Sequence, residues 1–202
     1  MAAMNDLELR FQKIYDEYHA RIHGYLRRMV GEDQAEDLTQ DVFVKIGQAL
    51  ENFRGESKLS TWIYRIATNT ALDNLRSVLR GDNKKLSVDY ISDTEADKNV
   101  WTGEDRNLTD KSVIRQEMNH CIREVIETLP ESYKLVLVLS DLEGMSDNEI
   151  SEIIGSSLQA TKIRIHRARV RLRSELEKTC VFYRDEENEF ACERKDSLAC
   201  KN

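Results

Sequence analysis

The chain has little of what interrupts a helix or crosses a membrane. It contains one proline and eight glycines in 202 residues, so long helices are seldom broken. Its longest purely aliphatic run, Leu135 to Leu139, is far shorter than the roughly 20 apolar residues that a membrane-spanning helix needs. The first residues, MAAMNDLELR, lack the basic start and the apolar centre of a signal peptide. We therefore expect a cytoplasmic protein with no membrane segment.

The usual marks of a catalytic centre are also missing. No glycine-rich phosphate loop and no nucleophile elbow is present. The histidines are scattered at His19, His23, His120 and His166. His19 and His23 share a helix face, but no third ligand lies near them, so a surface pair is the simpler interpretation. The sequence predicts neither an enzyme nor a cofactor.

Three of the four cysteines, Cys180, Cys192 and Cys200, lie in the segment 179–202. Their spacings of twelve and eight residues do not match the close cysteine pairs of structural zinc sites, and the segment has no histidine. Three interpretations stay open: a zinc or redox sensor, a regulatory disulfide, or incidental thiols in a small amphipathic extension. Cys121 has helical spacing to apolar neighbours and is predicted to lie in the core.

Hydrophobic periodicity divides the chain into two helical parts. The helical period runs through residues 7–80, with breaks at Gly31 and near Gly55, and resumes over 112–178. Between them, residues 81–111 are rich in polar and small residues, and acids outnumber bases. No segment alternates as a strand would. We predict an all-α fold of two small helical domains joined by a flexible acidic linker, with an acidic, cysteine-containing tail at 179–202.

The first part carries an acidic helix over residues 31–53. A predicted buried stripe consists of Ala35, Leu38, Val42, Ile46 and Ala49. The outward side chains are Glu36, Asp37, Gln40, Asp41 and Val44. An apolar residue among acids favours docking on a basic protein surface. The alternative is a plain solvated acidic face.

The following helix mixes aromatic, amide and guanidinium side chains. Ser60 or Thr61 is predicted to cap it, with the helix running from Trp62 onward. Its distinctive residues are Trp62, Tyr64, Arg65, Asn69, Asn74 and Arg76. Aromatic rings stack on unpaired bases and cations follow the backbone of a single strand, so single-stranded nucleic acid is the predicted ligand. For Trp62 a position in the core is an equally good interpretation.

The second part contains a helix-turn-helix signature. Ser146 and Glu149 form a capping box, Gly155 suits the turn, and Ser157 suits the cap of the next helix. The predicted buried stripe of that helix is Leu158, Thr161, Ile165, Ala168, Leu172 and Leu176. Six cations, with no acid among them, lie between positions 162 and 173 of a chain whose net charge is -7. Such a basic stripe on an acidic protein indicates a phosphate-bearing partner.

The outward face of this helix is suited to the major groove of DNA. The predicted contacts are Gln159, Ala160, Lys162, Ile163, Arg164, His166, Arg167 and Arg171. Amide and guanidinium groups pair with base edges, while neighbouring cations meet phosphates. The alternative is a solvated charged face on an ordinary amphipathic helix.

Two long motifs together resemble a known family. AEDLTQDVFVKI and FRGESKLSTWIYRIATNTALDNLR look like region 2 of the bacterial RNA polymerase sigma factors of the extracytoplasmic-function group. LPESYKLVLVLSDLEGMSDNEISEIIG, followed by KIRIHRARVRL, looks like their region 4. The resemblance spans roughly residues 10–177, in the order and spacing of the family.

The resemblance implies a role for each part. The acidic helix would bind the clamp helices of the largest polymerase subunit. The loop with Arg54, Ser57, Lys58, Ser60 and Thr61, and the helix after it, would recognise and open the −10 promoter element. The helix from Leu158 would read the −35 element, and residues 129–142 would help dock on the flap of the second-largest subunit. Members of the family are commonly held inactive by an anti-sigma protein.

A function of another class also fits part of the pattern. A stand-alone transcription regulator with a helix-turn-helix would bind its operator without polymerase. Such a regulator would need a ligand pocket or a dimerisation helix. The pattern of the first domain instead predicts an acidic outward face and a helix with aromatic and amide side chains. A gel shift without polymerase separates the two functions.

Overall fold

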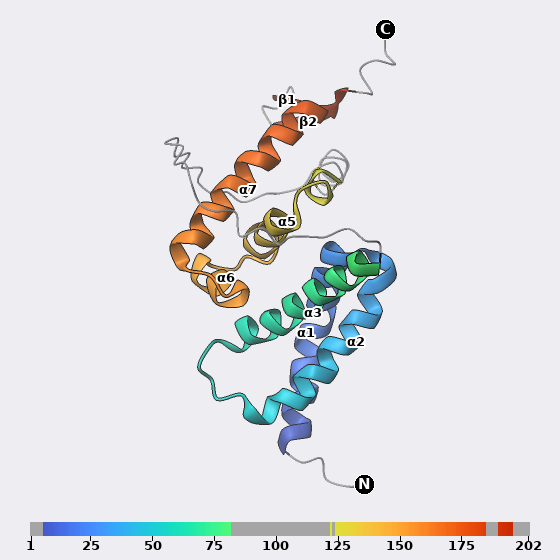
Figure 1. Ribbon diagram of the computed structural model, residues 1–202, viewed down its shortest axis with the longest axis vertical. Coiled ribbons are helices and arrows are strands. Elements are labelled where there is room, and N and C mark those ends of the chain that lie inside the picture. The colour runs from blue at the N-terminus through green and yellow to red at the C-terminus, as the bar shows by residue number, and fades with distance from the viewer. Residues whose placement is uncertain (1–5, 82–121, 123, 185–189, 196–202) are drawn as a thin grey trace.

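The computed structural model describes residues 6–81, 122, 124–184 and 190–195. Figure 1 shows two adjacent groups of helices. The N-terminal half consists of α1 (Asp6–Val30), α2 (Glu32–Ala49), the 3-10 turn η1 (Leu50–Asn52) and α3 (Leu59–Gly81). The C-terminal half consists of α5 (Glu131–Leu137), the π-helical turn η2 (Val138–Leu142), α6 (Asp147–Ile154) and α7 (Leu158–Thr179), followed by a short hairpin.

The breaks between the first helices lie where the sequence predicts them. Gly31 has φ of 92°, a left-handed conformation that glycine adopts without strain, and it separates α1 from α2. Near Gly55 the chain is non-helical over 53–58. α3 begins at Leu59, so Ser60 and Thr61 lie inside its first turn and do not cap it, contrary to the prediction. The backbone N–H of Trp62 already donates to the carbonyl of Lys58, at 3.0 Å.

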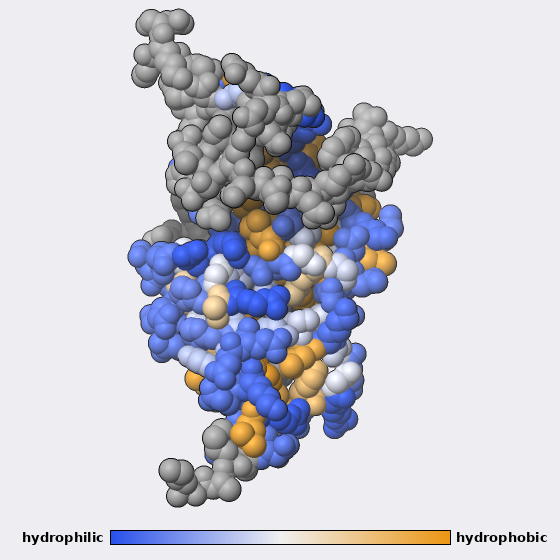
Figure 2. All heavy atoms as spheres, turned by 180° about the vertical axis from the view of Figure 1, so that it is seen from behind, coloured by the Kyte–Doolittle hydropathy of each residue, from blue (hydrophilic) through white to orange (hydrophobic). Residues whose placement is uncertain are grey.

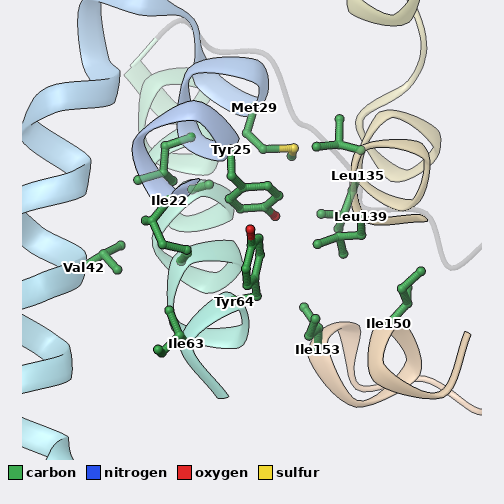
Figure 3. Close-up of a cluster of buried hydrophobic side chains, with 14 of the residues drawn as sticks. Ile22, Tyr25, Met29, Val42, Ile63, Tyr64, Leu135, Leu139, Ile150 and Ile153 are labelled. Atoms are coloured by element: carbon green, nitrogen blue, oxygen red, sulfur yellow. The ribbon is translucent and has the colours of Figure 1, made fainter. Parts of the chain in front are cut away.

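One hydrophobic core runs through both halves. In Figure 3, Leu135 and Leu139 of the C-terminal half face Met29 and Tyr25 of α1. Ile153 of α6 lies opposite Tyr64 of α3 in the same view. Because α6 packs on α3, and Leu135 and Leu139 belong to the same cluster as Tyr25 and Met29 of α1, the two predicted domains share a packed interface.

Helix α7 is followed by a two-stranded antiparallel sheet, which was not expected from the sequence. β1 (Cys180–Arg184) pairs with β2 (Phe190–Arg194), and Phe182 lies opposite Cys192. Three consecutive β-formers, Val181 to Tyr183, favour the extended backbone. In Figure 1 the sheet lies at the end of α7 remote from α6.

Several predictions concern residues that the structure does not describe. The predicted linker from residue 82 onward, Cys121 and Cys200 lie outside the described residues, as does the side chain of Cys192. Cys180 is described and is buried, with 2% of its surface exposed. Among the helices that are described, none is long and apolar enough to span a membrane. Figure 2 shows a largely hydrophilic surface on the described part of one face, with small apolar patches.

Candidate nucleic-acid and protein interfaces

The acidic face of α2 has the predicted geometry. Ala35, Leu38, Val42 and Ile46 are buried against the core. The opposite face is exposed at all five predicted positions, Glu36, Asp37, Gln40, Asp41 and Val44. Val44 is 59% exposed, more than any other large hydrophobic side chain of the described residues. The surface therefore offers carboxylates around an apolar centre, which suits a partner with basic and apolar side chains.

Helix α1 extends this face, a feature that was not anticipated from the sequence. The ring of Tyr15 lies 4.9 Å from that of Phe43, and His19 lies 5.6 Å from Phe43, between ring centroids. His23 Nε2 lies 3.6 Å from a carboxylate oxygen of Glu36. The recurrence of Tyr15, His19 and His23 at four-residue steps is the sequence signal that could have placed them beside α2.

The loop before α3 encloses a small hollow. Its volume is about 260 Å³, and it is lined by Asn52, Phe53, Arg54, Glu56, Ser57, Trp62 and Arg65. The rings of Phe53 and Trp62 lie 4.9 Å apart, so the lining combines a pair of aromatic rings with the guanidinium groups of Arg54 and Arg65. Four lining residues were predicted as DNA contacts; Asn52, Phe53 and Glu56 were not.

Two of the predicted DNA-contacting side chains of α3 are not available in this structure. Tyr64 is fully buried and Thr61 is 2% exposed, so neither offers an open group to a base. The prediction of an open stacking ring at Tyr64 is therefore corrected: its ring packs on Tyr25, at 5.3 Å between centroids. Trp62, which is 9% exposed, belongs to the core and also borders the hollow.

The remaining predicted α3 and loop residues line the surface to different degrees. Arg54, Lys58, Arg65, Asn69 and Arg76 are exposed, whereas Ser57, Ser60 and Asn74 are half-buried. Arg76 forms an ion pair with Asp73 at 3.2 Å. The side-chain oxygen of Asn74 is buried and has no hydrogen-bond partner among the described residues.

Two acidic residues of the C-terminal half contact this surface. Glu149 Oε1 lies 3.0 Å from Nζ of Lys58. Hydrogen bonds from the side chain and backbone of Ser146, and then from Lys58, lower the pKa of Glu149 to about 2. Glu143 accepts a hydrogen bond from the Tyr64 hydroxyl at 2.5 Å and one from Arg28 at 2.6 Å. Burial and the bond to Glu143 both raise the pKa of Tyr64.

The helix-turn-helix is built by the local signals that the sequence contains. Ser146 and Glu149 form both bonds of the capping box at the start of α6. Gly155 ends that helix with φ of 66° and ψ of 36°. The Ser157 side chain accepts from the backbone N–H of Ala160, which caps α7. All three local predictions are confirmed.

The outward face of α7 is accessible at its N-terminal end. Gln159, Lys162, His166 and Arg171 are exposed, while Ala160, Ile163, Arg164 and Arg167 are half-buried. Thr161, Ile165 and Ala168 are buried as predicted, but Leu158 is 38% exposed because it begins the helix beyond the core. Four of the eight predicted side chains of this face are therefore exposed and four are half-buried.

The basic stretch of α7 is compensated over its second half. Arg169 pairs with Asp141 at 2.5 Å, Arg171 with Glu175 at 2.9 Å and Arg173 with Glu177 at 2.8 Å. Lys162 and Arg164 make no ion pair with any residue that the structure describes. The net positive charge therefore concentrates on the first turns of the helix, where a base-reading helix meets the groove.

No group of three or more metal-ligating side chains is found within the described ranges. Cys180 lies in the described part, but the other tail thiols do not, so the sensor interpretations stay predictions.

Comparison with known proteins assigns both halves. Residues 14–80 match the model of sigma-70 region 2, and residues 119–172 match that of sigma-70 region 4. The chain is 33% identical over 173 residues to the RNA polymerase sigma factor SigZ of Bacillus subtilis, covering 85% of this chain and 90% of that protein. It is 30% identical over 168 residues to the ECF RNA polymerase sigma-E factor of Haemophilus influenzae, and the match covers 83% of this chain and 87% of that protein.

Solved structures share the fold. The sigma factor RpoE of Bartonella quintana, in complex with the anti-sigma factor NepR, matches with a TM-score of 0.62 and 20% identity, over 83% of this chain and 97% of that one. CnrH, in complex with the cytosolic domain of CnrY, matches with a TM-score of 0.58 and 22% identity, over 83% of this chain and 88% of that one.

Sigma factors bind core RNA polymerase and promoter DNA, and they act in transcription initiation without being enzymes. With both regions matched in order and curated relatives covered over most of their length, the chain belongs to the extracytoplasmic-function group of RNA polymerase sigma factors.

Proposed function

We propose that the exposed face of α2 binds the clamp helices of the largest polymerase subunit. Support comes from Val44, a 59% exposed apolar side chain among the carboxylates of Asp37 and Asp41. Carboxylates guide a basic partner and the apolar centre supplies desolvation energy on contact. The rings of Tyr15 and His19 continue this face on α1.

The hollow before α3 is the proposed site for an unstacked base of the −10 element. The aromatic wall of Phe53 and Trp62 suits stacking, and Arg54 and Arg65 suit the flanking phosphates. Lys58 and Asn69 extend the contact along the strand. Stacking on bound rings offsets the cost of unstacking, a few kcal/mol per step, so no nucleotide hydrolysis is needed.

Helix α7 is the proposed reader of the −35 element. Gln159 is exposed at the start of the helix, where an amide reaches adenine edges in the major groove. Lys162 and Arg164 follow on the same open portion and suit the phosphates or guanine edges. Arg171 is paired with Glu175 and is expected to contribute less.

Two finer partner assignments complete the proposal. Leu142, which is 43% exposed, is the described residue of the 129–142 segment best placed to meet the flap of the second-largest subunit. An anti-sigma factor is a proposed further partner, because the sigma factor RpoE of Bartonella quintana, which shares this fold, was solved in complex with the anti-sigma factor NepR. We place the protein in the cytoplasm with the polymerase, with region 2 at 7–80, a linker at 81–111 and region 4 at 112–178.

The observation that carries the proposal is the presence, on one chain, of an acidic face on α2 and of a basic turn on α7 whose Lys162 and Arg164 form no ion pair among the described residues. Run-off transcription with core polymerase on a promoter library tests it. We expect discrete transcripts that core polymerase alone does not make. The proposal fails if the added protein produces no promoter-specific transcript. It also fails if, in a gel shift, the protein binds promoter DNA as tightly without polymerase as with it.

A further inference from the structure

A buried carboxylate joins the two regions. The side chain of Glu143, which directly follows η2, is 7% exposed. It accepts one hydrogen bond from Arg28 of α1 and one from Tyr64 of α3, at 2.6 and 2.5 Å. A carboxylate that holds both a guanidinium and a phenol is difficult to replace, because its loss leaves the buried Tyr64 hydroxyl unpaired and the half-buried Arg28 without this partner.

Apolar and backbone contacts surround this carboxylate. Leu135 and Leu139 lie against Met29 and Tyr25 in Figure 3. The buried ammonium group of Lys134 donates to the carbonyl of Met29 at 3.2 Å, near the C-terminal end of α1. Cations are favoured at that end of a helix, so the charge and the carbonyl satisfy each other. The contact between the halves thus combines apolar packing with the polar contacts of Glu143 and Lys134.

This arrangement pairs side chains of α3 and of the loop before it with acidic residues of region 4. Tyr64 is bound to Glu143, and Lys58 is bound to Glu149 at 3.0 Å. Glu149 belongs to α6, the helix that directly precedes the recognition helix. The −10 surface and the helix-turn-helix are therefore in direct contact.

Promoter geometry is incompatible with that contact. The −10 and −35 elements are about 25 base pairs apart by their names, or on the order of 85 Å at about 3.4 Å per base pair. Helix α7 has 22 residues and spans only about 33 Å at 1.5 Å per residue. Region 2 and region 4 cannot reach both elements while Lys58 touches Glu149. The segment 82–121 has enough residues to span on the order of 130 Å when extended.

We propose that Glu143 is an intramolecular latch, which holds region 4 on region 2 in the free protein and keeps it from engaging a promoter until core polymerase separates the regions. The inference rests on the proposed promoter contacts of Lys58 and α7. Opening breaks the bonds of Glu143 to Arg28 and Tyr64 together with the packing of Leu135 and Leu139. Polymerase binding to both regions supplies the compensating free energy.

Three single variants of the full chain test the latch. Glu143→Gln removes the buried charge, and Arg28→Gln removes its partner from the other helix. Glu152→Gln is the matched control, because Glu152 is exposed on α6 and loses the same charge. None of these residues belongs to the proposed DNA or polymerase contacts. Circular dichroism first establishes that each variant keeps the helicity of the wild type.

Small-angle scattering of the free proteins provides the first readout. A compact chain of this length has a radius of gyration of about 17 Å. We expect the wild type and Glu152→Gln near this value, and Glu143→Gln and Arg28→Gln several ångströms larger. Equal radii for all four proteins would overturn the latch. If one latch variant loses its helices, the radius of gyration of the other latch variant decides whether the latch exists.

Binding of a labelled 12-nucleotide single-stranded DNA of mixed sequence, without polymerase, provides the second readout. We expect both latch variants to bind at least about fivefold tighter than Glu152→Gln. Arg28→Gln is the sharper case, because losing a positive charge weakens DNA binding on electrostatic grounds alone. Weaker or unchanged binding by Arg28→Gln contradicts the latch.

The outcomes separate this inference from the proposed function. If wild-type protein supports promoter-specific transcription with core polymerase while the variants show wild-type radii and DNA affinity, the latch is wrong and the function stands. If no promoter-specific transcription occurs but the variants expand, the contact is real and the proposed promoter role is wrong.

Discussion

Lys58 and Glu149 are 91 positions apart in the chain, yet the Lys58 ammonium lies 3.0 Å from the Glu149 carboxylate. Glu149 also closes the capping box of α6 through the hydroxyl and backbone N–H of Ser146. One carboxylate thus supports a local helix start and a contact between the two sigma regions.

Acid should weaken this element in a defined pH window. The pKa of Glu149 is lowered from 4.5 to about 2, first by the Ser146 side chain. A depressed folded-state pKa contributes stability above the unfolded value, and that contribution is lost as the pH falls from about 4.5 to about 2. We expect Glu149→Gln to lower the urea midpoint at pH 7 and to differ little from wild type near pH 2. A constant difference across this range would contradict the assigned titration.

Replacing Gly155 by alanine should destabilise region 4 through the backbone alone. Gly155 has φ of 66°, and a Cβ atom at this position would meet no other atom within 4 Å, so no side-chain clash contributes. The left-handed conformation costs an alanine about 1 kcal/mol. Urea unfolding measures this loss. Gly155→Asn is the control, since asparagine tolerates this conformation and should lose less.

The buried hydroxyls of Tyr25 and Thr68 are expected to depend on each other for their contribution to the free energy of unfolding. The two oxygens lie 2.7 Å apart and both residues are fully buried. Tyr25→Phe leaves the Thr68 hydroxyl unpaired, at a cost of about 1–3 kcal/mol in the free energy of unfolding. The double variant with Thr68→Val should recover part of that loss. Strictly additive losses would show that the two hydroxyls do not depend on each other.

Lys162 should matter for DNA binding, and Arg173 should not. Lys162 is exposed without an ion pair among the described residues, whereas Arg173 pairs with Glu177 at 2.8 Å. With holoenzyme on a −35-containing promoter, Lys162→Ala should weaken binding and reduce the slope against log salt by about one. Arg173→Ala is the control of equal charge change. Equal effects of the two substitutions would place the DNA elsewhere on α7.

A positive charge at Val44 should impair polymerase binding. Val44→Lys places an ammonium at the apolar centre of the acidic face, opposite a partner expected to be basic. We expect at least about tenfold weaker binding to core polymerase, corresponding to about 1.4 kcal/mol. Ala20→Lys introduces the same charge at an exposed position of α1. If Val44→Lys binds as well as this control, the α2 face is not the docking surface.

Features that depend on neighbouring residues were predictable from the sequence. The capping box at Ser146, the left-handed Gly155 and the Ser157 cap all form within four residues, and each is present. The exposed side of α2 also followed from its helical period. In both cases the determining contacts are local or lie on one helix face.

Features that depend on distant residues were not predictable. The ring of Tyr64 resembles an open stacking platform in the sequence, but it is buried against Tyr25, and its hydroxyl bonds to Glu143, 79 positions later. The β1–β2 sheet was missed because five-residue strands give too short an alternation to recognise. The start of α3 at Leu59 was misplaced because Ser60 and Thr61 are good caps in isolation.

The π-helical turn η2 determines the direction, about the helix axis, in which the chain after it points. The backbone N–H of Glu143 bonds to the carbonyl of Val138, five residues earlier, so this turn holds one residue more than an α-helical turn. Deleting a single residue there would restore an α-helix and rotate the following chain by about 100°. Glu143 would then point away from Tyr64 with its chemistry unchanged. Sigma factors that share these side chains but lack the extra residue should therefore present region 4 in a different orientation.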